Sequence, residues 1–135
     1  DLQAIGLNVK IQKFDFPTQL TKARTGDYQL ALLGYGYAID PDESSYYVPG
    51  GGSNFSQTDD PVLTQMFANA STLTSSDQRR VAYNEIQQYM QDKQYVTALY
   101  APFYIMAQSK SLKGGFGNFW EGGLYDIQNW TLDGK

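Results

Sequence analysis

Residues 28–34 are the stretch that most limits the possible folds of this 135-residue chain. The run is almost entirely apolar, which is typical of a β-strand covered on both faces in a parallel or mixed sheet. Residues 7–14 alternate apolar and polar side chains and predict a strand with one buried face. A short helix is expected between them over residues 18–25, with Gly26 as its stop. The order strand, helix, strand predicts an α/β fold with a mixed sheet flanked by helices.

The second half of the chain carries clear helix-start signals. Asp60 is placed to cap a helix that has Pro61 at its first position. Ser75 begins a capping-box pattern, which predicts a second helix that runs to about residue 92. Two further strands are expected between residues 95 and 107, followed by a tail of loops and short strands. The residues expected on the buried sides of the two helices are Leu63, Met66, Phe67, Ala70, Val81, Ile86 and Met90.

The composition excludes several classes of function. The net charge of −4 and the sequence pI of about 4.6 argue against binding to the phosphate backbone of nucleic acids. The chain has no cysteine and no histidine. It therefore lacks thiolate metal ligands, disulfides, and the commonest general base and transition-metal ligand. We expect a binding protein rather than an enzyme, with no cofactor and no metal.

The first residues predict that the fold is incomplete. Leu2 and Ile5 have helical spacing, and Gly6 is placed as the glycine that follows a helix. A helix that ends so early is expected to have lost its beginning, so residues 1–135 are interpreted as a single partial domain. Its sheet is expected to have an open edge, covered by the remainder of a parent chain or by a second copy.

The densest acidic cluster, Asp40, Asp42 and Glu43, has three possible roles. A carboxylate pair for glycoside hydrolysis requires two groups about 5–10 Å apart, which neighbours in a loop rarely provide. The alternating oxygen ligands fit a calcium loop in part, but the glycine and the distal glutamate of an EF-hand are missing. The third and favoured role is an Asp-Pro turn whose carboxylates cap backbone N–H groups or face water.

The order of segments resembles bacterial extracellular solute-binding proteins of family 5, the peptide, nickel and oligosaccharide binders of ABC transporters. The stretches that carry the resemblance are residues 2–9, 26–36, 40–42, 54–63, 80–87 and 96–100. The resemblance implies the C-terminal part of the second lobe of a periplasmic-binding-protein-like fold of class II. It also implies an extracytoplasmic protein, with its signal in a preceding part of the parent chain, that captures an oligopeptide or similar solute for a membrane permease.

The resemblance also implies a ligand-binding loop. The residues that it assigns to ligand contact are Tyr35, Gly36, Tyr37, Ala38, Asp40 and Asn54. Peptide-binding members usually carry an aromatic residue and, three residues later, an Asp that pairs with the ammonium group of the peptide. Here Ala38 occupies the Asp position, so either Asp40 replaces it or the solute has no ammonium group. A sugar stacked on Tyr35 or Tyr37 is the alternative ligand.

Two other functions stay open on the residues alone. A small hydrolase would use acidic side chains that face each other across a pocket. An adhesion or assembly module would use the many exposed aromatic residues as a protein interface, since 11 Tyr and 7 Phe are unusual for a chain of this length.

Overall fold

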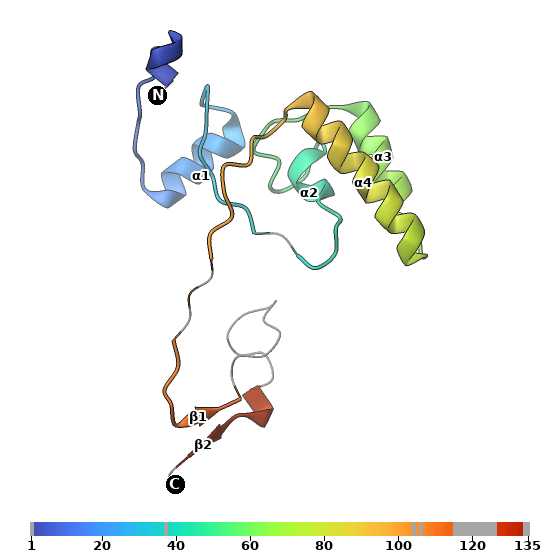
Figure 1. Cartoon of the computed structure of the whole chain (residues 1–135). Helices are drawn as coiled ribbons and strands as arrows, with labels where there is room; N and C mark the ends of the chain where they lie inside the picture. The colour runs from blue at the N-terminus through green and yellow to red at the C-terminus, as the bar shows by residue number, and fades with distance from the viewer. Residues whose placement is uncertain (1, 37, 104, 106, 115–126, 134–135) are drawn as a thin grey trace. The chain divides into compact units, whose positions relative to one another are not determined.

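The computed structural model describes residues 2–36, 38–103, 105, 107–114 and 127–133 (Figure 1). They fall into two compact units, residues 1–35 with 42–96 and residues 36–41 with 97–135. The first unit contains a 3-10 helix, Leu2–Ile5, and the helices α1, Phe16–Thr25; α2, Ser44–Tyr47; α3, Pro61–Ser71; and α4, Ser76–Lys93. The second contains β1, Leu112–Lys113; a 3-10 helix, Ile127–Asn129; and β2, Thr131–Leu132. The described chain thus combines helices with a small sheet, which is broadly compatible with the predicted α/β class.

Helix α1 begins two residues earlier than predicted because Asp15 caps it. The Asp15 carboxylate accepts hydrogen bonds from the Thr18 N–H at 3.0 Å and from the Thr18 hydroxyl at 2.9 Å. Both bonds lower the pKa of Asp15. At the other end Gly26 has φ 71°, in the left-handed region, and its N–H donates to the Ala23 carbonyl. The predicted glycine stop is therefore confirmed.

The α3 start was also predicted correctly. Asp60 Oδ1 accepts from the N–H groups of Val62 and Leu63, at 2.7 and 3.2 Å. Asp60 Oδ2 accepts from the hydroxyls of Tyr89, at 2.8 Å, and of Tyr95. These four donors stabilise the charged carboxylate and hold the pKa of Asp60 at about 2.

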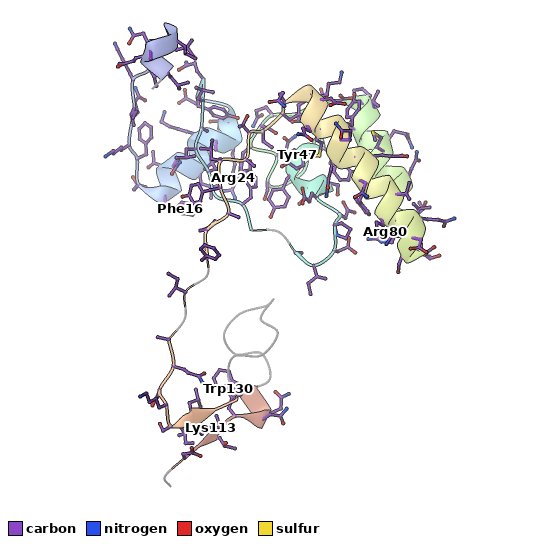
Figure 2. All side chains as sticks on the ribbon, in the orientation of Figure 1. Phe16, Arg24, Tyr47, Arg80, Lys113 and Trp130 are labelled. Atoms are coloured by element: carbon purple, nitrogen blue, oxygen red, sulfur yellow. The ribbon has the colours of Figure 1, made fainter. Side chains whose placement is uncertain are left out.

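The core of the first unit lies where α3 packs against α4 and where α2 covers α3 (Figure 1). Tyr47 reaches from α2 toward these helices, as Figure 2 shows. The buried residues of this core are Tyr47, Leu63, Phe67, Ala70, Tyr83 and Ile86. The predicted stripe on α3 is confirmed for Leu63, Phe67 and Ala70, and Met66 packs at its edge.

The predicted inward side of α4 is confirmed for Ile86, which is buried, and for Met90, which packs against the core, but it is wrong for Val81. Val81 is 56% exposed, whereas Tyr83 is buried beside Ile86. The prediction for Val81 was wrong because five residues separate it from Ile86, which is about 140° of helical rotation. Tyr83 lies three residues before Ile86 and shares its face. Ser75 occupies the cap position, but its side chain makes no capping bond, so the predicted capping box does not form.

The strands predicted over residues 7–14, 28–34 and 95–100 do not form. A fourth strand was predicted over residues 103–107, and its described residues, 103, 105 and 107, are not in a strand either. Among the described residues β1 and β2 make the only sheet, an antiparallel pair of Leu112 with Leu132 and of Lys113 with Thr131. A strand requires a hydrogen-bonded neighbour. No other described segment forms strand hydrogen bonds with these residues. An apolar pattern by itself does not provide a neighbouring strand.

We expect Asp60→Asn to lower the melting temperature, because the neutral amide accepts weaker hydrogen bonds from the Tyr89 and Tyr95 hydroxyls. The folded-state pKa of Asp60, about 2, lies below its ordinary value of 3.8. Its stabilising contribution is therefore fully present above pH 4 and disappears as the pH falls from about 4 to 2. Thermal unfolding of both proteins from pH 7 to pH 2 should show the difference shrinking over that interval.

The matched control for this experiment is Asp59→Asn. Asp59 is the exposed neighbour of Asp60, and its replacement removes one negative charge without touching the capping bonds. Equal melting temperatures of the Asp59 and Asp60 variants at pH 7 would contradict the stabilising role of the Asp60 network.

Candidate functional site

The described part of the predicted ligand loop centres on Tyr35, which lies in a cluster of aromatic rings. The Tyr35 ring meets Tyr46 in an edge-on arrangement with centroids 5.2 Å apart. It also meets Phe55 at 6.0 Å with the ring planes tilted by 45°. All three rings are half-buried, so each keeps part of its surface toward solvent. Such rings can stack on a planar or apolar group of a solute.

The loop before α3 presents Phe55 to this cluster, and Asn54 holds that loop in shape. The Asn54 side-chain oxygen accepts from the Thr58 N–H at 3.0 Å and from the Ser56 hydroxyl at 3.2 Å. Its amide nitrogen donates to the carbonyls of Val48, at 3.1 Å, and Thr58, at 2.7 Å. Since these bonds use both ends of the carboxamide, the geometry gives Asn54 a positioning role. Its direct contact with a ligand stays a prediction.

Contacts with α1 fix the other side of the loop. The Tyr28 hydroxyl donates to the Phe55 carbonyl. The Gln57 side chain donates to the carbonyls of Ala23 and Arg24 at the end of α1, both at 3.2 Å. The Arg24 guanidinium lies 6.0 Å from the centroid of the Phe55 ring. Contacts with the end of α1 and with α2 therefore hold the aromatic cluster in place.

The remaining predicted contact residues do not belong to the first unit or fall outside the described residues. Gly36, Ala38 and Asp40 are exposed and belong to the second unit, whereas Tyr35 and Asn54 belong to the first. Tyr37 lies outside the described residues. Within one unit the structure thus brings together Tyr35 and the loop that Asn54 shapes.

Sequence reasoning missed Tyr46 and Phe55 as partners of Tyr35. Tyr46 reaches the cluster because α2, which was not predicted, turns the chain directly after the acidic loop. A local signal for α2 does exist, since the Asp42 carboxylate accepts from the Ser44 N–H at 2.9 Å. This bond fits the favoured role of the acidic loop as a capping turn.

The acidic loop contributes one unusual carboxylate. Burial raises the pKa of Glu43 above its ordinary value. No group of three or more acidic side chains within the described ranges could hold a metal ion. The first unit therefore offers an aromatic surface, and a half-buried carboxylate at the start of the helix that carries Tyr46.

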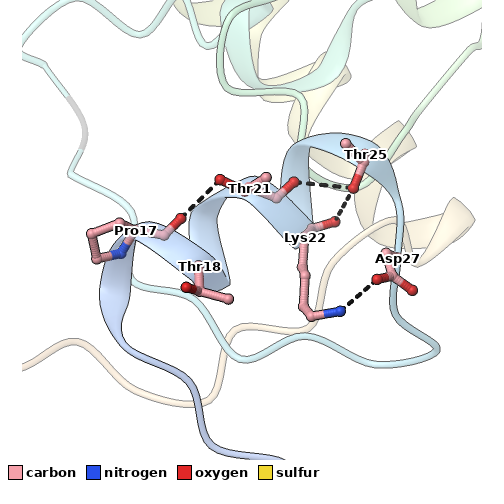
Figure 3. Close-up of a pocket in the computed structure, with 6 residues that line it drawn as sticks. All are labelled: Pro17, Thr18, Thr21, Lys22, Thr25 and Asp27. Carbon is pink, nitrogen blue, oxygen red and sulfur yellow. Dashed lines mark hydrogen bonds and ion pairs between the residues drawn. The ribbon is translucent and has the colours of Figure 1, made fainter.

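An open hollow runs along α1, lined by Pro17, Thr18, Thr21, Lys22, Thr25 and Asp27 (Figure 3). Its polar groups bond to one another or to the helix. The Lys22 ammonium pairs with the Asp27 carboxylate at 2.5 Å, and the Thr21 and Thr25 hydroxyls donate to carbonyls one turn earlier. With these groups already satisfied, the hollow offers a ligand little specific binding.

Comparisons of the chain with protein-family models, with curated proteins and with solved structures give no match. None of the helices within the described residues is both long enough and apolar enough to cross a membrane. The function must therefore be argued from the residues and from the aromatic cluster.

Proposed function

We propose that the chain is part of the second lobe of an extracytoplasmic solute-binding protein of an ABC transporter, and that it forms one wall of the solute cleft. The observation that carries the proposal is the position of Tyr35. Its ring lies at the end of the apolar run 28–34, where the resemblance assigns ligand contact, and is braced by Tyr46 and Phe55. The captured solute would pass from this protein to a membrane permease.

The exposed apolar run supports the finer statement about the fold. Leu30 and Leu32 are 78% and 71% exposed. Exposed apolar side chains on a segment that belongs to no sheet can be covered when the segment pairs with a strand. In the proposed lobe, residues 7–14 and 28–34 are strands of a mixed sheet. The rest of the parent chain, or a second copy, would supply their partners.

The proposed solute is an oligopeptide or an oligosaccharide. Ala38 carries no charge for a peptide ammonium group, which favours a solute that stacks on aromatic rings. Aromatic faces pair with the apolar faces of sugars as well as with peptide side chains, so Tyr35 serves either class.

The test is to incubate the chain with a tripeptide pool and with a pool of short oligosaccharides, and to identify what it retains by mass spectrometry. Dissociation constants for a retained solute then compare the wild type with Tyr35→Ala. We expect binding to weaken about fivefold, because one aromatic stacking contact contributes about 1 kcal/mol.

Tyr100→Ala is the matched control, because Tyr100 is 79% exposed in the second unit and has no assigned role. It should bind the solute as the wild type does. Retention of neither pool would refute solute capture. Concentration-dependent association in place of solute binding would support the adhesion or assembly function instead.

A further inference from the structure

Glu43 is a half-buried residue whose carboxylate forms no hydrogen bond or ion pair with another described residue. It directly precedes α2, and burial raises the pKa of its carboxyl group. The ion pairs of the described residues join Lys22 to Asp27, Arg80 to Asp77 and Lys113 to Asp133, and none of them involves Glu43. Asp42 and Asp60, by contrast, accept bonds from backbone N–H groups. Partly desolvated carboxylates normally have such partners, so an unpaired one has unused capacity for a cation.

Aromatic rings lie on the same turn as this carboxylate. The Tyr46 N–H donates to the Glu43 carbonyl at 2.9 Å. This backbone bond ties Glu43, the cap residue of α2, to the residue that carries the Tyr46 ring, three positions further along the same turn. Tyr35 meets that ring edge-on at 5.2 Å. The faces of aromatic rings attract cations, and most strongly those that are weakly hydrated, such as substituted ammonium groups.

The same cluster already attracts a cation of the chain itself. The guanidinium of Arg24 lies over Phe55, 6.0 Å from its centroid. No ion pair joins Arg24 to Glu43 among the described residues. The Arg24 guanidinium therefore interacts with the Phe55 ring and does not neutralise the Glu43 carboxylate. A cationic group of a bound solute could pair with that carboxylate.

We propose that Glu43, with the rings of Tyr35 and Tyr46, forms a subsite for a positively charged amine or ammonium group of the solute. The inference rests on the proposed function, because it assigns a charge preference to the same solute wall. It narrows the ligand to solutes that carry an organic cation.

The test uses two probes that differ in charge but share one shape, choline and the uncharged alcohol dimethylbutanol. NMR titration of the whole chain measures both dissociation constants. We expect the wild type to bind choline at least about fivefold more tightly, from cation–π attraction and charge pairing together. Glu43→Gln should reduce this preference to the part that the aromatic rings supply, and Glu43→Asp, which keeps the charge, should retain it.

Glu85→Gln is the matched control, because Glu85 is exposed on α4 and its removal changes the net charge equally. It should keep the choline preference. Equal binding of both probes by the wild type, or an unchanged preference in Glu43→Gln, overturns the subsite. If the solute pools are still retained in that case, the proposed function stands. If the chain prefers choline but retains neither pool, only the proposed function is overturned. If it shows no choline preference and retains neither pool, the cation subsite and the proposed function are both overturned.

Discussion

Replacing Gly51 with alanine should lower the free energy of unfolding of the first unit by about 2 kcal/mol, because the added methyl group has no room. A Cβ atom at this position would lie 2.4 Å from the Ser45 carbonyl oxygen and 3.0 Å from the Val48 carbonyl oxygen. Both are backbone atoms, so a side-chain rotation cannot relieve the clash. The Ser45 carbonyl also accepts the Ser53 N–H at 3.1 Å, and any retreat of the loop breaks this bond.

Gly52→Ala provides a control one residue away. A Cβ atom there meets no atom within 4 Å, so we expect a change of no more than about 0.5 kcal/mol. Urea unfolding followed by far-UV circular dichroism measures both variants. The prediction fails if they are equally stable. Near-UV circular dichroism should also change for Gly51→Ala alone, because the displaced loop carries Phe55 away from the Tyr35 ring.

The features that the sequence predicted well depend on neighbouring residues. Asp60 with Pro61 begins α3, and Gly26 ends α1, because a cap or a left-handed turn involves only a few consecutive residues. The buried stripe on α3 follows from helical periodicity in the same way. On α4 the periodicity correctly assigned Ile86 and Met90 to the inward side but also assigned Val81, whereas Tyr83 is the residue buried beside Ile86. The burial of Tyr83 results from the packing of α4 against α3, and a local sequence pattern does not contain that information.

The strands could not be predicted from the chain alone because pairing is a property of two segments. Residues 28–34 have the apolar pattern of a covered strand, yet Leu30 and Leu32 stay exposed without a partner. A pattern of hydrophobicity reports that a segment benefits from burial, and it does not identify what buries it. The same reasoning applies to residues 7–14.

The candidate site was predicted only at its centre. Tyr35 was identified because the resemblance assigns ligand contact there. Tyr46 and Phe55 reach it through α2 and through a loop that Asn54 shapes with four side-chain hydrogen bonds. This convergence of segments depends on tertiary contacts. A short capped turn such as residues 42–47 gives too weak a sequence signal to reveal it in advance.

Leu63→Ala should cause the largest loss of stability, about 3 kcal/mol, because it leaves a cavity where Leu63 is completely buried. Leu63 lies in the core formed by α2, α3 and α4, and its neighbours include the rigid rings of Tyr47 and Phe67. Such rings are held by several contacts at once and cannot easily move to fill the space. Equilibrium urea unfolding should give a lower midpoint with little change in slope.

Val62→Ala is the control for this variant, because Val62 precedes Leu63 in α3 but is 54% exposed. Its effect should stay below about 0.5 kcal/mol, since little buried surface is lost and alanine favours the helix. Equal losses for the two variants would contradict the assigned core. The comparison also bears on the site, because Tyr46 packs against this core and meets the Tyr35 ring. If the core holds Tyr46 in place, Leu63→Ala should weaken solute binding while leaving every proposed contact residue intact.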